Sequence, residues 1–93
     1  MTYPETFGIA AFRSRQQVMR FDGALRRANI KSEIISTPRD VAIGCGLSVK
    51  FDLADLRTVQ NIYRQSRPGN LIGFYEVLRT PGQKPQVLPL RVQ

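Results

Sequence analysis

The order of short apolar segments and amphipathic segments restricts the fold of this chain more than any other feature of its sequence. Residues 7–12 (FGIAAF) form a short apolar run between polar residues, which is typical of a buried strand. After a capping-box signature at Ser14, apolar side chains recur at helical spacing over residues 15–28. Residues 33–36 predict a second strand, which Pro38 ends because proline cannot donate to a sheet ladder. The first half of the chain therefore predicts a strand, a helix and a strand.

The second half of the chain predicts a strand, a helix and a further strand. Residues 47–51 (LSVKF) alternate apolar and polar side chains, which indicates a strand with one buried face. Asp52 is placed to cap a helix that extends to a turn at residues 67–70 (RPGN). The apolar stripe of this helix consists of Leu53, Leu56, Val59 and Tyr63. Residues 71–78 (LIGFYEVL) predict the fourth strand.

This order, βαββαβ, is that of the ferredoxin-like split unit. We therefore predict an α+β sandwich in which a four-stranded antiparallel or mixed sheet carries both helices on one face. Residues 1–78 form the single ferredoxin-like domain of this prediction. The remaining residues, 79–93, contain three prolines and predict a loose C-terminal tail. The alternative is that residues 87–90 (VLPL) dock on a sheet edge or on a neighbouring subunit.

The charge of the chain allows an anionic partner without requiring one. The 93 residues carry a formal net charge of +7, and eleven of the fourteen Lys and Arg residues are arginine. Because no basic run exceeds two residues, a basic surface with scattered charges is the simpler interpretation. Nucleic acid is the alternative partner that such a charge suggests.

Residue types that are absent or rare exclude several classes of function. The chain has no histidine, so the commonest general base and the commonest neutral metal ligand are missing. We predict no metal site and no cofactor, and a carrier or binding module rather than an enzyme. One cysteine cannot form an internal disulfide, and no apolar run approaches the ~18 residues needed to cross a bilayer. With no signal-peptide pattern at the start, we expect a cytoplasmic protein without a membrane partner.

The only cysteine, Cys45, lies between Gly44 and Gly46 at the junction of a loop and the third predicted strand. In the predicted topology this loop lies at the same end of the sheet as the start of the first helix. Helix N–H groups and guanidinium groups there would stabilise a thiolate or a persulfide anion. The cationic neighbours expected at this rim are Arg13, Arg15, Arg39 and Arg67. The alternative is that Cys45 is a buried, unreactive residue at a strand end.

The sheet face away from the helices is predicted to be lined by small or polar side chains. We expect Gly8, Ala10, Ser48 and Lys50 on this face. They offer no aromatic platform for stacked bases, so RNA binding through the sheet is disfavoured. Such a face suits a dimer surface or a cover for the tail.

Two segments resemble a known family. Thr37-Pro38-Arg39 and residues 45–52 (CGLSVKFD) are similar to the selenium/sulfur carrier protein-like family of small bacterial proteins, with a resemblance that covers about residues 7–78. The resemblance implies that Cys45 carries sulfur or selenium as a persulfide or perselenide. It also implies that Arg39 and the flanking glycines, Gly44 and Gly46, form the seat of the carried atom. The chain departs from the family in Ile43-Gly44, where small hydroxyl residues are expected, and in its longer extension after Leu78.

Three hypotheses of function follow. In the first, Cys45 accepts sulfur or selenium from a donor protein and passes it to an acceptor protein. In the second, the protein is a homodimeric binding or regulatory module that holds a small anion at the same rim. The residues predicted to hold such an anion are Arg39, Gly44, Gly46, Arg13, Ser14 and Arg15. The third is weak nucleic-acid binding through the net positive charge.

Overall fold

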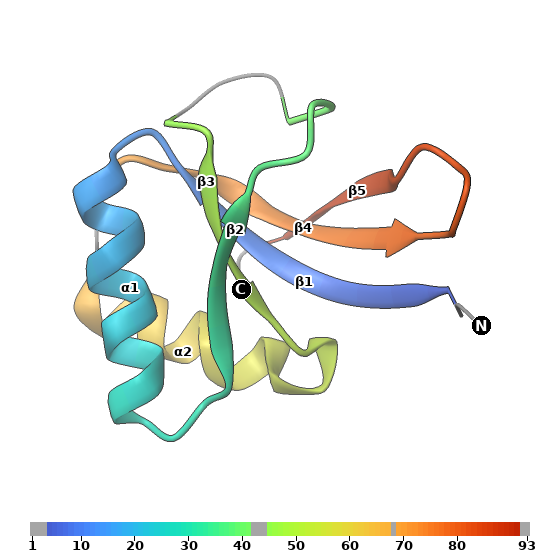
Figure 1. Cartoon of the computed structure of the whole chain (residues 1–93). Coiled ribbons are helices and arrows are strands. Elements are labelled where there is room, and N and C mark those ends of the chain that lie inside the picture. The colour runs from blue at the N-terminus through green and yellow to red at the C-terminus, as the bar shows by residue number, and fades with distance from the viewer. Residues whose placement is uncertain (1–3, 42–44, 68, 92–93) are drawn as a thin grey trace.

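The protein is an α+β structure in which two helices pack on one face of a five-stranded sheet (Figure 1). The computed structural model describes residues 4–41, 45–67 and 69–91. The elements, in chain order, are β1 (Glu5–Phe12), α1 (Arg15–Arg27), β2 (Ser32–Ser36), β3 (Leu47–Phe51), the 3-10 turn η1 (Leu53–Asp55), α2 (Leu56–Ser66), β4 (Leu71–Arg79) and β5 (Gln86–Leu90). Within these ranges no helix is long and apolar enough to cross a membrane.

The strands lie in the order β2-β3-β1-β4-β5, and every neighbouring pair is antiparallel. Strand β1 is central: Ile9 lies opposite Lys50 of β3 on one side and Tyr75 of β4 on the other. Because β1 and β2 both pair antiparallel with β3, they run in the same direction, as the sequence predicts. The start of α1 and the end of β2 therefore lie at one end of the sheet (Figure 1).

The α+β class is confirmed, whereas the predicted number of four strands is wrong. Residues 86–90 form β5 and pair with β4 from Leu78↔Gln86 to Phe74↔Leu90, so the expected loose tail is wrong and the alternative, docking of residues 87–90 on a sheet edge, is confirmed. Val87 and Leu90 pack against opposite faces of the sheet, so the strand has apolar contacts on both sides. Pro89 is tolerated because β5 is an edge strand, where a missing N–H is not needed by a further partner.

The helix caps differ from the prediction, although α1 begins at Arg15 as predicted. Asp52 does not cap α2 directly: residues 53–55 form η1 first, and the Asp52 side chain makes no capping hydrogen bond. The Ser14 side chain likewise makes no capping hydrogen bond to α1, so the predicted capping box is not formed. After α1, Asn29 has a left-handed backbone with φ 62°, and Ile30 N donates to Leu25 O at 2.9 Å, which ends the helix.

Apolar side chains form one cluster on each face of the sheet. On the helix side, Ala10 and Phe12 of β1 pack with Phe21 of α1 and Val59 of α2. The second cluster, on the face away from the helices, consists of Phe7, Ile9, Ala11, Val41 and Val77. The prediction that Gly8 and Ala10 lie on the face away from the helices is therefore wrong, since a Cβ at Gly8 would also meet Phe51 of the helix-side cluster. Because residues 7–12 are nearly all apolar, their sequence has no period of two from which the face could be read.

Charged side chains cover the end of the second cluster. Lys50 Nζ lies 4.5 Å from the centre of the Phe7 ring and donates to Glu5 Oε1 at 2.6 Å. This hydrogen bond and the charge of Lys50, with a further contribution from Arg79, hold the pKa of Glu5 below its usual range. Because the pKa is lowered by folding, the pair stabilises the fold above the ordinary carboxyl pKa. That contribution is lost as the pH falls through the lowered value.

Gly8 is the position in β1 where a larger side chain has no room. A Cβ there would lie 2.5 Å from Cε2 of Phe51, whose ring is only 2% exposed. We expect Gly8→Ala to lower the free energy of unfolding by about 1–3 kcal/mol, measured by urea denaturation, because the buried ring must move. The matched control is Gly23→Ala in α1, where the added Cβ meets only Arg27 Nη1 at 3.4 Å. The control should raise stability by about 0.5–1 kcal/mol. A Gly8→Ala variant as stable as the parent would contradict this packing.

Candidate functional site

Three connections of the chain meet at the end of the sheet where α1 begins. Cys45 N donates to Phe12 O at 3.4 Å, Arg13 N donates to Asn70 O at 2.7 Å, and Thr37 N donates to Gly46 O at 2.9 Å. The connections after β1, before β3 and before β4 are thus joined by backbone hydrogen bonds. Cys45 lies next to the start of α1, where the topology predicted it, and we call this end of the sheet the Cys45 rim.

The Cys45 sulfur is half-buried and faces carbonyl oxygens. Sγ lies 3.6 Å from Phe12 O and 3.7 Å from Leu47 O, so the thiol is placed to donate weakly to either oxygen. The side chain packs against the helix-side apolar cluster. A second atom bound to Sγ must therefore point away from these two oxygens, toward the open side of the rim.

Gly46 has a backbone conformation that favours glycine. Its φ is +85°, in the left-handed region, while an added Cβ would meet no atom within 4 Å. Glycine is favoured at this position by the backbone conformation and not by a lack of space for a side chain. The other flanking glycine, Gly44, lies outside the described residues.

A pair of hydroxyl groups fixes the loop to β3. The oxygens of Thr37 and Ser48 lie 2.7 Å apart, and Ser48 is fully buried. Thr37 directly follows β2, so this hydrogen bond joins the first residue of the loop to the strand that follows Cys45. Nothing in the sequence indicated this hydrogen bond beyond the presence of two hydroxyl residues.

The start of α1 presents backbone donors and arginines without acidic side chains. The first turn contains no Asp or Glu, and the side chains of Arg13 and Arg15 are exposed. Because Ser14 does not cap the helix with its side chain, the first N–H groups have no side-chain acceptor from it. This end of α1 can therefore favour an anion held at the rim.

Arg39 lies on another side of the loop. Val41 N donates to Pro38 O at 3.0 Å, and Val41 packs in the cluster on the face away from the helices, whereas Cys45 packs on the helix side. The exposed Arg39 lines a hollow with Lys84 and Pro85 of the β4–β5 connection. Lys84 Nζ lies 3.3 Å from Asp40 Oδ1. Among the described residues no hydrogen bond joins Arg39 to Cys45, so the seat formed by Arg39 stays a prediction.

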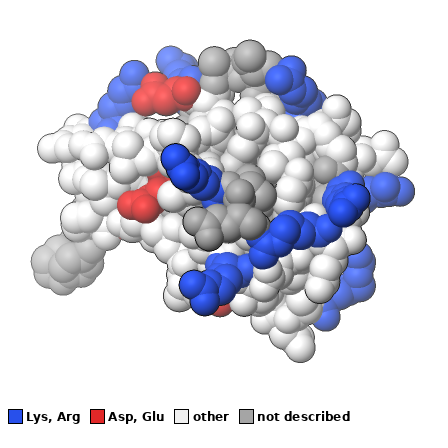
Figure 2. Space-filling model, turned by 180° about the vertical axis from the view of Figure 1, so that it is seen from behind, with Lys and Arg blue, Asp and Glu red and all other residues white. Residues whose placement is uncertain are grey.

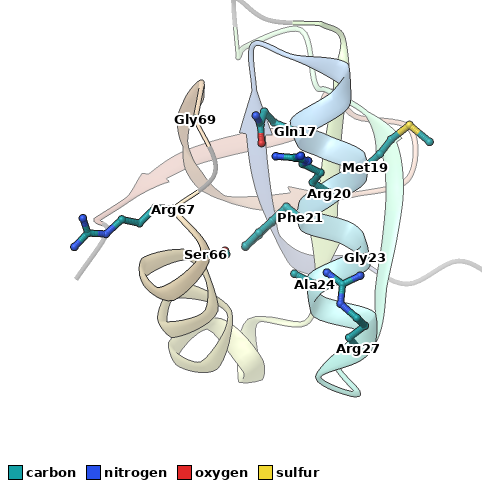
Figure 3. Close-up of a pocket in the computed structure, with 10 residues that line it drawn as sticks. All are labelled: Gln17, Met19, Arg20, Phe21, Gly23, Ala24, Arg27, Ser66, Arg67 and Gly69. Atoms are coloured by element: carbon teal, nitrogen blue, oxygen red, sulfur yellow. The ribbon is translucent and has the colours of Figure 1, made fainter.

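A hollow between α1 and the end of α2 was not predicted from the sequence (Figure 3). In Figure 3, Gln17, Arg20 and Phe21 extend from α1 toward the segment that contains Gly69. The Gln17 Oε1 atom is buried and has no hydrogen-bond partner in the described part of the chain. The seven-residue spacing of Arg20 and Arg27, both in this hollow, is the sequence signal that could have indicated it.

Comparison with known families supports the resemblance seen in the sequence. The family described as "Putative Se/S carrier protein-like" matches residues 7–76. The chain belongs to this family. The matched region begins in β1 and ends inside β4, so it includes Cys45 and leaves β5 outside. Comparison with curated proteins found no significant match, and comparison with solved structures found none either.

The Thr37–Ser48 hydrogen bond provides a test of how firmly the loop is held. We expect Thr37→Val to lower the free energy of unfolding by about 1–3 kcal/mol, because it leaves the buried Ser48 hydroxyl without this partner. Adding Ser48→Ala removes the unpaired hydroxyl, so the double variant should be more stable than Thr37→Val. A urea-denaturation double-mutant cycle measures this coupling. Simple additivity of the two substitutions would contradict the pairing.

Proposed function

We propose that this protein is a sulfur or selenium carrier, in which Cys45 holds the transferred atom as a persulfide or perselenide. The observation that carries the proposal is that the only cysteine lies half-exposed beside the uncapped start of α1, within the region that matches the carrier family. In this proposal β1 to β4 with the two helices form a ferredoxin-like unit that serves as a rigid platform. The protein acts in the cytoplasm between a donor protein and an acceptor protein.

The transfer is an exchange at sulfur. The Cys45 thiolate attacks the outer sulfur of a persulfide on the donor, a bond forms between Sγ and that sulfur, and the donor's own S–S bond breaks. The donor cysteine leaves as a thiolate and takes up the proton that Cys45 has lost. The reverse exchange onto an acceptor thiol unloads the carrier, so the two steps need no oxidant or reductant.

The geometry of the rim suits each stage of this exchange. In the unloaded protein the thiol faces the oxygens of Phe12 and Leu47. After loading, Sγ carries no hydrogen and can no longer donate to them, so the carried atom turns outward. There the N–H groups of α1, with Arg13 and Arg15, stabilise its negative charge. Gly46, directly after Cys45, has a left-handed backbone that suits glycine, so no side chain is added at this position.

Mass spectrometry of the intact protein after exposure to inorganic polysulfide tests the proposal. We expect an adduct of one sulfur atom that dithiothreitol removes, with no adduct on Cys45→Ser. The rate of iodoacetamide labelling against pH, compared with that of a free cysteine peptide, shows whether the rim favours the thiolate. A Cys45 that takes up no sulfur while remaining open to iodoacetamide would contradict the carrier function.

The cations of the rim provide a second test. We expect Arg13→Gln combined with Arg15→Gln to slow sulfur loading by about fivefold at low salt, because the cations beside the start of α1 stabilise the attacking thiolate. The matched control, Arg39→Gln, removes a cation whose side chain lines the hollow with Lys84. The control should change the loading rate less than the double variant. A larger effect at Arg39 would instead support the seat implied by the family resemblance.

A further inference from the structure

Helix α2 lies between two hollows that are lined by arginines. The first lies between α1 and the end of α2, and its arginines are Arg20, Arg27 and Arg67. The second lies between α2 and the C-terminal end of β5, and its arginines are Arg57, Arg64 and Arg91. Figure 2 shows the molecule from behind, with a band of blue side chains across the lower part of that face and few red ones. We call the surface around α2 that contains both hollows the helix face.

The charge of the helix face is not balanced locally. Neither hollow is lined by an aspartate or a glutamate. The ion pairs found in the described residues use Arg26, Lys50 and Lys84, none of which lines either hollow. Asp22 of α1 is occupied by Arg26 and by the hydroxyl of Ser32. Within the described part of the chain, the six arginines of the two hollows therefore have no acidic partner, although Arg64 Nη2 donates to Asn61 Oδ1.

The spacing of these arginines is regular along the two helices. Arg20 and Arg27 are seven residues apart in α1, and Arg57 and Arg64 are seven residues apart in α2. Seven residues are close to two helical turns, so each pair lies on one side of its helix with a rise of about 10 Å between its members. A polyanion with closely and evenly spaced charges can contact both members of each pair. A nucleic-acid strand carries one phosphate for about every 3.4 Å of duplex axis.

The apolar groups of the helix face decide which polyanion fits. Single-stranded nucleic acid is held by exposed aromatic rings, but Phe21 in the first hollow is almost fully buried. Protein partners need buried apolar anchors, and the large exposed apolar side chains in the described residues are only Met19 and Leu88. Met19 also lines the first hollow, although in Figure 3 its side chain extends to the side of α1 away from α2. Arginines that have no exposed aromatic ring beside them can contact phosphates, but they do not recognise individual bases.

We propose that the helix face binds the phosphodiester backbone of double-stranded nucleic acid without sequence preference. The guanidinium groups of the four helical arginines supply the contacts along the two helices, and Arg67 and Arg91 extend them beyond the end of α2 and of β5. This binding does not depend on the thiol of Cys45 and is separate from the proposed carrier function.

Fluorescence anisotropy with labelled RNA and DNA duplexes of about 20 base pairs tests the proposal. We expect affinity to fall steeply with salt, with a slope of about −0.9 in log K against log salt for each phosphate contact. Arg20→Gln with Arg27→Gln, and separately Arg57→Gln with Arg64→Gln, should each weaken binding at least tenfold and reduce the slope by about two. Cys45→Ser should bind as the parent does, which separates this test from that of the carrier function.

The matched control removes the same number of charges elsewhere. Lys31→Gln with Arg79→Gln alters two exposed cations that line neither arginine hollow, and Arg79 lies over the Phe7 ring on the other side of the sheet. The control should lose no more than about threefold in affinity. An equal loss in the control would overturn the proposal, because binding would follow net charge alone. It would also be overturned if polyglutamate competed as well as a duplex, or if single strands bound more tightly than duplexes. Thermal unfolding of every variant checks that the fold is kept.

Discussion

The burial of β1 on both of its faces is the constraint on which the rest of the structure depends. Residues 7–12 are buried without interruption, with Phe12 and Ala10 against the helices and Phe7, Ile9 and Ala11 against the second cluster. Because β1 is central, its end fixes where α1 starts and where the two neighbouring strands begin. The oxygen of Phe12 accepts hydrogen bonds from the backbone of Cys45 and lies near its sulfur. The position of the thiol thus depends on the same strand that organises the core.

The Cys45 rim combines rigid and adaptable parts. The backbone is held by hydrogen bonds between three connections and by the buried Ser48 hydroxyl, while the sulfur itself makes only weak contacts with two carbonyl oxygens. The proposed carrier function would need this combination, since the attacking sulfur has to turn while its backbone stays in place. The first turn of α1, which has no side-chain cap and no acidic residue, would favour the negative charge that the proposed carrier function places on the sulfur.

Charge is divided between the two sides of the molecule. The pairs Glu5–Lys50 and Asp40–Lys84 involve the strands and loops around the second cluster, where they neutralise one another. The arginines around α2 have no such partners among the described residues. The cations without an acidic partner among the described residues therefore include all six arginines of the helix face.

Local patterns in the sequence determined the elements, and tertiary contacts decided how they meet. The alternation at residues 47–51 predicted β3, and the helical periods predicted α1 and most of α2. Because β1 and β2 both pair antiparallel with β3, they run in the same direction, and Cys45 therefore lies near the start of α1. The sequence left the docking of β5 on a sheet edge as an alternative only, because a strand that contains Pro89 depends on an edge position and on apolar contacts on both sides. It could not show which residues of β1 face the helices, since a wholly apolar run has no periodicity. The sequence also did not show that Arg39 and Lys84 line one hollow, or that six arginines surround α2. In each case the residues belong to segments that are distant in the chain and come close only after folding.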